Sequence, residues 1–264
     1  MIAAFVHGCA LPSLGGGGEL DGLQVMSVVV DPPLIRPGDL PSAVAWVADP
    51  TEEGFELLLW TCTDLGQGCL ESGFPLAQWT NTPLVADGRS EPWLPPLDTA
   101  AIPPDLTLTI NVFGLACAPG VCPEIGLVRE HDSTVGDLLA DPFGFARTLP
   151  MEGTSLVRRE VAATGSPATL ENRNPQVDET PTAASYSHVR TGAIVPLHFR
   201  LSDETDMTSN GFATCGTIAD GIWTGHDLDL TFTAPDAPAS CEIWVTIEDG
   251  TGGSAVWRGV SVIQ

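Results

Sequence analysis

Short apolar runs alternate along the chain with turns rich in proline and glycine. Residues 23–30 form an apolar, β-branched run that stops before Pro32, and residues 44–48 and 55–60 repeat this pattern. Residues 106–112 alternate apolar and polar side chains, as expected of a strand with one buried face. Runs of this length between turn residues predict β-strands rather than helices.

The region after these strands departs from the pattern. Residues 115–150 contain two cysteines and a segment from Ser133 that can begin a short helix, which Pro142 limits. Residues 154–161 then resume the β-branched pattern. We therefore predict a disulfide-bearing, partly helical insertion at 115–150, before the last strand of a first β-module.

The second half of the chain repeats the first. Val189-Arg190-Thr191-Gly192 corresponds to Ile35-Arg36-Pro37-Gly38, and an aspartate follows eleven residues after each glycine. Such an ordered repeat indicates two copies of one structural unit. The predicted boundaries are a first module at 23–164, a linker at 165–175 and a second module at 176–264.

Each copy has about seven short strands separated by turn signals. That number of strands predicts an all-β fold of two tandem immunoglobulin-like (Ig-like) β-sandwiches. The arrangement resembles the tandem Ig-like domains of bacterial surface lipoproteins, a class-level resemblance that covers nearly all of the chain. The resemblance implies a protein that acts by binding or assembly rather than by catalysis.

Composition and charge narrow the classes of partner. Apolar residues make up 43% of the 264 residues, enough to build cores and too many for a disordered chain. The chain has 34 acidic and 10 basic residues, for a net charge of −24. Nucleic acid is excluded as a partner because its phosphates would be repelled. We expect a protein partner instead.

The chain contains seven cysteines, an odd number. If Cys9 is set apart, an even number remains, which fits disulfides in an oxidising compartment. Many pairings are open in principle. Proximity along the chain favours Cys62–Cys69, Cys117–Cys122 and Cys215–Cys241.

The N-terminal segment accounts for the odd cysteine. Val6-His7-Gly8-Cys9 follows an apolar stretch and resembles the lipobox of bacterial lipoproteins. The resemblance implies cleavage before Cys9, a lipid on its thiol, and residues 1–22 as a truncated signal, lipobox and glycine-rich leash. Ala10 after the cysteine resembles outer-membrane sorting, so the expected location is the bacterial cell envelope. The alternative is an ordinary N-terminus with a buried or free cysteine.

Acidic loops predict a calcium site. Asp203 and Asp206 lie in one predicted loop of the second module and Asp249 lies in another, and an Ig-like topology brings both loops to the end that meets the linker. The linker also resembles the Asn-rich linkers of cadherin-like repeats. Ca²⁺ prefers several carboxylate and amide oxygens. Solvated acidic turns are the alternative, and no other cofactor is predicted.

Aromatic residues in irregular regions predict a binding surface. Trp79 and Trp93 lie in a proline-rich stretch, and His131 lies in the insertion. Loops on a rigid scaffold commonly carry binding function, although core packing is the alternative for both tryptophans. Tryptophans within strands are predicted to be core residues: Trp46, Trp60, Trp244 and Trp257.

Catalytic motifs of common hydrolases are absent from the sequence. It contains no G-x-S-x-G, no H-E-x-x-H and no P-loop pattern. Asp227 and Asp229 share one face of a predicted strand. They would form either a site of paired carboxylates or the acidic outer face of an edge strand. The alternative function is a secreted or periplasmic hydrolase with a site between residues 117–150 and one end of a sandwich.

Overall fold

The computed structural model describes most of the two predicted modules. The described residues are 20, 22–51, 54–63, 74–82, 87–89, 98–104, 106–121, 153–165, 173–202, 207–249 and 252–264. Of residues 62–63, 74–82, 87–89 and 220, only the backbone is described. No helix in these residues is long and apolar enough to cross a membrane.

Strands form nearly all of the regular structure. The first group comprises β1 (Gln24–Asp31), β2 (Leu34–Ile35), β3 (Ser42–Ala48), β4 (Phe55–Thr63), β5 (Phe74–Thr82), β6 (Asp87–Arg89), the 3-10 helix η1 (Thr99–Ala101), β7 (Thr107–Cys117) and β8 (Thr154–Thr164). The second group comprises β9 (Val177–Glu179), the short helix α3 (Ala183–Tyr186), β10 (His188–Val189), β11 (Ile194–Leu201), β12 (Met207–Ala213), β13 (Thr217–Thr224), β14 (Asp227–Thr233), β15 (Ala239–Asp249) and β16 (Ser254–Ile263).

The first group of strands folds into a sandwich of two sheets. Their strand orders are β1-β3-β6 and β2-β8-β7-β4-β5. Apolar residues at alternate positions meet between the sheets, because successive side chains of a strand point to opposite faces. Val28 of β1, Leu59 of β4, Ile110 of β7 and Val161 of β8 are among these buried residues.

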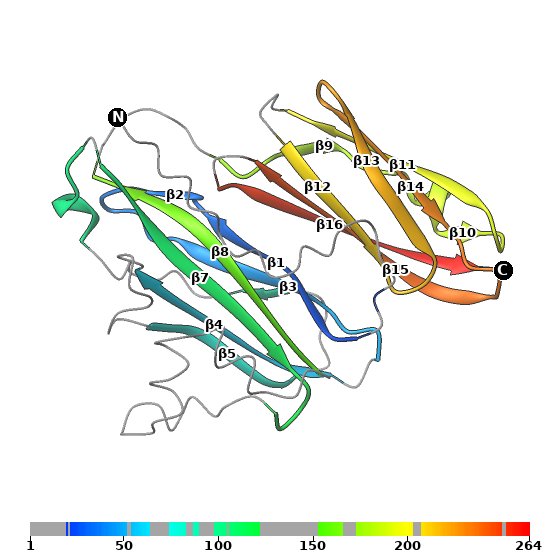
Figure 1. Ribbon diagram of the computed structural model, residues 1–264, viewed down its shortest axis with the longest axis horizontal. Coiled ribbons are helices and arrows are strands. Elements are labelled where there is room, and N and C mark those ends of the chain that lie inside the picture. Colours follow the sequence, from blue (N-terminus) through cyan, green and yellow to red (C-terminus); the bar gives the residue numbers. More distant parts are fainter. Residues whose placement is uncertain are drawn as a thin grey trace.

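The second group forms another sandwich of two sheets. Its sheets have the orders β13-β14-β11-β9 and β10-β16-β15-β12 (Figure 1). In β11 the pattern of buried and exposed residues alternates strictly, and Leu197 and Phe199 point into the core. The all-β class and the two tandem Ig-like sandwiches are therefore confirmed.

The predicted repeat also corresponds in space. A two-residue strand, β2 in the first sandwich and β10 in the second, pairs in parallel with the last strand of its own sandwich. Each short strand is followed by a glycine with positive φ, 89° at Gly38 and 68° at Gly192. Glycine tolerates this left-handed conformation without the steric cost that other residues carry.

Two expected boundaries need correction. β7 continues to Cys117, so residues 115–117 belong to a strand and not to the predicted insertion. Leu115 and Ala116 are buried and pair with β4 and β8, which explains the longer strand. Leu20 was assigned to the flexible leash, but it is packed between the sandwiches because its apolar side chain finds a buried site there. The predicted helix at Ser133 lies outside the described residues.

The β4–β7 part of the larger sheet of the first sandwich is buried on both faces. Leu58, Trp60, Phe113 and Leu115 point away from the core between the sheets, yet each is buried. Trp60 stacks on Phe113 with ring centroids 5.0 Å apart and planes at 11°. The outer face of the β4–β7 pair is therefore covered rather than exposed to solvent.

Candidate functional site

The two sandwiches are joined by an apolar cluster, which we call the seam. Its buried members are Leu20, Met26, Ala48, Phe212 and Trp244, and Trp46 and Val256 pack against them. They come from β1 and β3 of the first sandwich, from β12, β15 and β16 of the second, and from the segment before β1. The sandwiches thus lie against one another along their sheets, with β1 beside β16 (Figure 1).

Trp244 is the central residue of the seam. The odd-numbered residues Ile243 and Val245 of β15 lie in the core of the second sandwich, so Trp244 points to the outer face of its sheet. Its exposed fraction is nevertheless 0%, because the first sandwich covers it. Trp46 of β3 meets it edge to face, with ring centroids 6.3 Å apart and planes at 74°.

The buried indole N–H of Trp244 has a polar partner. It donates a hydrogen bond of 3.1 Å to Oε2 of Glu242. The Oε1 of Glu242 is paired with the guanidinium of Arg258, which also lies 5.3 Å above the centroid of the Trp244 ring. This arrangement satisfies the indole donor and adds a cation–π contact to the edge of the seam.

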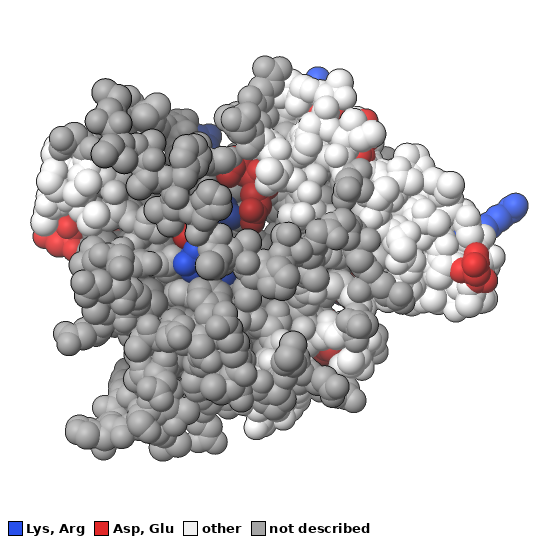
Figure 2. Space-filling view, in the orientation of Figure 1, with Lys and Arg blue, Asp and Glu red and all other residues white. Residues whose placement is uncertain are grey.

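Arg159 forms an ion pair across the junction. It starts from β8 of the first sandwich, and its Nη1 donates to Oε1 of Glu248 in β15 at 3.0 Å. Its Nη2 donates to the carbonyl of Gly252 in the loop after β15. The Arg159 side chain is 11% exposed, so this pair is screened less than an ordinary surface salt bridge. Figure 2 shows acidic and arginine side chains together near this junction.

Asn174, at the end of the linker, binds both sandwiches with one side chain. Its Nδ2 donates to the carbonyl of Val30 in β1 at 2.9 Å. Its Oδ1 accepts from the backbone N–H of Ser254 in β16, also at 2.9 Å. The described end of the linker is therefore fixed to both modules.

The linker end lies beside both predicted acidic loops. The N–H of Ser202, at the start of one loop, donates to the carbonyl of Gln176 at 3.1 Å. In the other loop, a Cβ placed on Gly253 would lie 3.0 Å from Pro175, so glycine permits this close approach. The described ends of the two loops and of the linker thus meet at one end of the second sandwich.

Of the three predicted calcium ligands, Asp249 is described. Its Oδ1 accepts from the N–H of Gly253 at 2.7 Å, which closes the turn between β15 and β16. Asp203 and Asp206 lie outside the described residues. Among the residues that are described, no group of three or more His, Cys, Asp or Glu side chains is placed to hold a metal ion. The calcium site stays a prediction.

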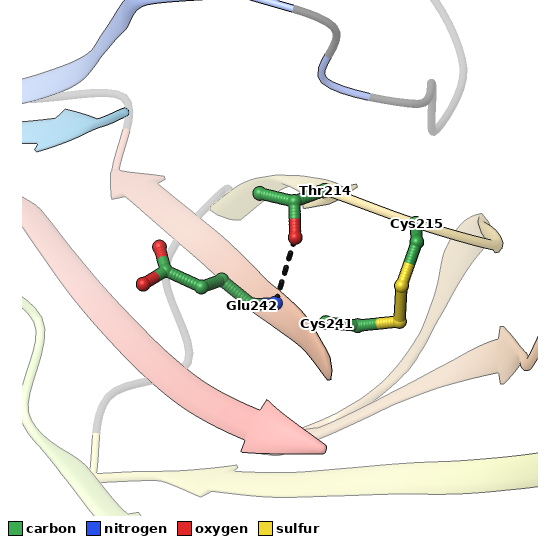
Figure 3. Close-up of a disulfide and its surroundings, with 4 residues drawn as sticks. All are labelled: Thr214, Cys215, Cys241 and Glu242. Atoms are coloured by element: carbon green, nitrogen blue, oxygen red, sulfur yellow. Dashed lines mark hydrogen bonds between the residues drawn. A yellow bond between two sulfur atoms is a disulfide. The ribbon is translucent and has the colours of Figure 1, made fainter. Parts of the chain in front are cut away.

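A disulfide joins Cys215 to Cys241, the pairing that proximity favours (Figure 3). Cys215 follows β12 and Cys241 lies in the neighbouring strand β15, with their Cα atoms 5.2 Å apart. Beside the disulfide, the N–H of Glu242 donates to Oγ1 of Thr214 at 2.8 Å. The disulfide thus extends the β12–β15 ladder beyond the end of β12.

The remaining predicted site residues are described in part or not at all. Cys117 is disulfide-bonded. Trp79 lies in β5, but its side chain is outside the described set, as is that of Cys62. Nothing is described for the other predicted residues: Cys9, Cys69, Trp93, Cys122 and His131.

Asp227 and Asp229, the acidic pair on β14, lie on the outer face of their sheet. β14 pairs with β13 on one side and β11 on the other, so the expectation of an edge strand is wrong. On this face Nδ1 of His198 lies 2.8 Å from Oδ1 of Asp229, and its Nε2 lies 3.7 Å from Oδ1 of Asp227. The hydrogen bond to Asp229 raises the pKa of His198 above 6.5. Desolvation lowers this pKa, whereas the negative charges of Asp229, Asp227 and Glu179 raise it further.

The candidate sites predicted from the sequence lie in loops and do not include the seam. Trp46 and Trp244 were expected in the cores, but they pack between the two sandwiches. Phe212, Trp244 and Val256 occupy outward-facing strand positions, where a solvated sheet would carry polar residues. These apolar residues were the available signal. Nothing in the sequence distinguishes Arg159 or Asn174, because arginine and asparagine are common at protein surfaces.

No protein-family model and no curated protein sequence matches the chain. Among solved structures, the fibronectin(III)-like modules of Clostridium thermocellum CbhA are similar, with 9% identity, a TM-score of 0.27, and coverage of 90% of this chain and 93% of that chain. The ICAM-5 D1–D4 ectodomain fragment has 12% identity, a TM-score of 0.24, and coverage of 92% of this chain and 54% of that chain. The Ig-like assignment itself follows from the strand orders of the two sandwiches.

Proposed function

We propose that this protein is a binding or assembly module of the bacterial cell envelope, anchored to the outer membrane by a lipid on Cys9. Two Ig-like sandwiches provide a rigid scaffold that presents loops to a partner. The proposed partner is a protein, which Trp79, Trp93 and His131 would contact. Ca²⁺ held by Asp203, Asp206 and Asp249 would order the loops beside the linker.

The observation that carries this proposal is the disulfide between Cys215 and Cys241. Disulfides persist in oxidising compartments and are rare in the cytosol. Cys117 is also disulfide-bonded, which supports the same compartment. An exported protein is in the right place for lipid attachment at the Val6-His7-Gly8-Cys9 segment.

Mass spectrometry of the protein purified from envelope fractions tests the anchor. The expected N-terminal peptide begins at Cys9 and carries the mass of a diacylglycerol. In the matched Cys9→Ser variant, this modification is expected to disappear and the protein to leave the membrane fraction. An unmodified Cys9 in envelope-derived protein would contradict the lipid anchor, whatever the partner.

Cross-linking and affinity capture from envelope extracts test the binding surface. Trp79→Ala and Trp93→Ala are expected to reduce the capture of a specific protein. Ile222→Ser is the control, because Ile222 is an exposed apolar residue of the second sandwich. Equal capture by all three folded variants would exclude these tryptophans from the binding surface.

A further inference from the structure

We propose that Leu20 acts as a strap that closes the seam, so that the two sandwiches behave as one rigid body while it is in place. This proposal does not depend on a lipid at Cys9 or on a partner. The contacts involved all lie within the chain.

The strap contacts the second sandwich although it precedes the first in the sequence. The N–H of Leu20 donates to the carbonyl of Ala213 at 2.7 Å. Ala213 ends β12, which is an edge strand of its sheet. Leu20 therefore adds a backbone hydrogen bond at the edge of a sheet that belongs to the other module.

The side chain of Leu20 completes the apolar seam. It is 5% exposed and clusters with Met26 of the first sandwich and with Phe212 and Trp244 of the second. Because the leucine contacts apolar groups from both modules, its burial requires both to be in place. Separation of the sandwiches would expose the leucine together with the large ring of Trp244, which the hydrophobic effect opposes.

The strap and Arg159 hold the junction at two separate places. Ala213 pairs with Ile243 on β15, whereas the ion pair of Arg159 is made with Glu248. These two positions on β15 are five residues apart, which corresponds to about 17 Å along a strand. Asn174 lies at the Arg159 end, because it binds the N–H of Ser254, the residue paired with Glu248.

Two separated attachments prevent a rotation that one attachment would allow. Arg159 and Asn174 hold one end of the β12–β15 ladder. Leu20 fixes the other end, where Trp46 and Trp244 meet in the same cluster. The strap thus adds to the other apolar contacts of the seam and opposes rotation about the Arg159 end.

The test is a Leu20→Asp substitution in the full chain. Small-angle X-ray scattering measures the radius of gyration, and hydrogen exchange measures protection of the amide at position 20. We expect a larger radius of gyration and loss of amide protection, because a carboxylate will not remain in the apolar seam. Leu40→Asp is the matched control, since Leu40 is 57% exposed in the first sandwich; it should leave both values unchanged.

A second pair of variants keeps the test decisive if Leu20→Asp does not fold. Leu20→Ala should give a smaller change in the same direction, and Leu20→Met should restore the wild-type radius because methionine fills a similar apolar volume. If Leu20→Ala folds and retains both the wild-type radius and the amide protection, the strap proposal is wrong.

Discussion

Arg159 shows how one residue can join two modules. All ten basic residues of the chain are arginines. The planar guanidinium presents several donors in a fixed fork, so Arg159 binds the carboxylate of Glu248 and the carbonyl of Gly252 together. A lysine ammonium is a compact point charge and lacks this planar fork. Arg159 thus connects the first sandwich to β15 through an ion pair and to the loop after it through a hydrogen bond.

Removal of this guanidinium should destabilise the protein measurably. Arg159→Gln is expected to lower the free energy of unfolding by about 1–3 kcal/mol, because a largely buried, charged hydrogen-bond partner is lost. Urea denaturation measures this change. Arg200→Gln is the control, since Arg200 is exposed on β11 and should change stability by less than about 0.5 kcal/mol. Equal effects of the two substitutions would show that Arg159 contributes no more than a surface arginine.

At the scale of strands, the β12–β15 ladder carries much of the candidate site. One of its ends is closed by the Cys215–Cys241 disulfide, and the seam covers its outer face at Phe212 and Trp244. The disulfide and two of the seam residues therefore lie on the same pair of strands.

Loss of the disulfide should weaken the second sandwich. The bonded cysteines are 26 residues apart in the sequence, and closure of such a loop stabilises by about 3 kcal/mol in the chain-entropy model. The double substitution of Cys215→Ala and Cys241→Ala should lower the free energy of unfolding by this order. Thr208→Ala on the same ladder is the control. An unchanged urea midpoint for the cysteine variant would contradict the prediction.

The outer face of β11 and β14 gives a prediction for pH. His198 donates to Asp229, so its pKa is raised above 6.5. The protonated histidine is favoured in the folded state, and the pair therefore stabilises the fold below about pH 6.5 and loses this contribution as the pH rises through the folded pKa. The energy is small because both side chains are about half exposed.

A histidine titration followed by NMR checks this sign. The wild-type pKa of His198 should lie above 6.5, and Asp229→Asn should lower it toward that value. His188, exposed on β10, is the reference signal within the same sample. A pKa for His198 that does not fall in the Asp229→Asn variant would exclude this hydrogen bond as the cause.

Most strands were predictable from the sequence, because apolar periodicity and turn residues are local signals. The repeat around Gly38 and Gly192 was predictable for the same reason. Strand β5 was missed because its segment is mixed with prolines and polar residues. The seam was not predicted, because periodicity shows which side chains share a sheet face but not which other module covers that face. Leu20 was missed since a single leucine after a glycine run carries no periodic signal.

At the scale of the whole molecule, the two sandwiches pack against each other rather than being joined only by a linker. Leu20 is eleven residues after Cys9, so a lipid at Cys9 would lie at most about 40 Å from the seam along an extended chain. In the proposed anchored form, the junction would therefore stay close to the membrane while the strap holds it. The acidic surface, with a net charge of −24, would also repel anionic lipid headgroups.

The central claim is that the seam joins the two Ig-like sandwiches into one rigid body. Residual dipolar couplings of backbone amides, measured by NMR on the intact chain in a weakly aligning medium, test this most directly. We predict that amides of β7 and β8 and those of β14 and β15 fit a single alignment tensor with the orientation seen here. Two distinct alignment tensors, one for each sandwich, would show independent motion and contradict the claim.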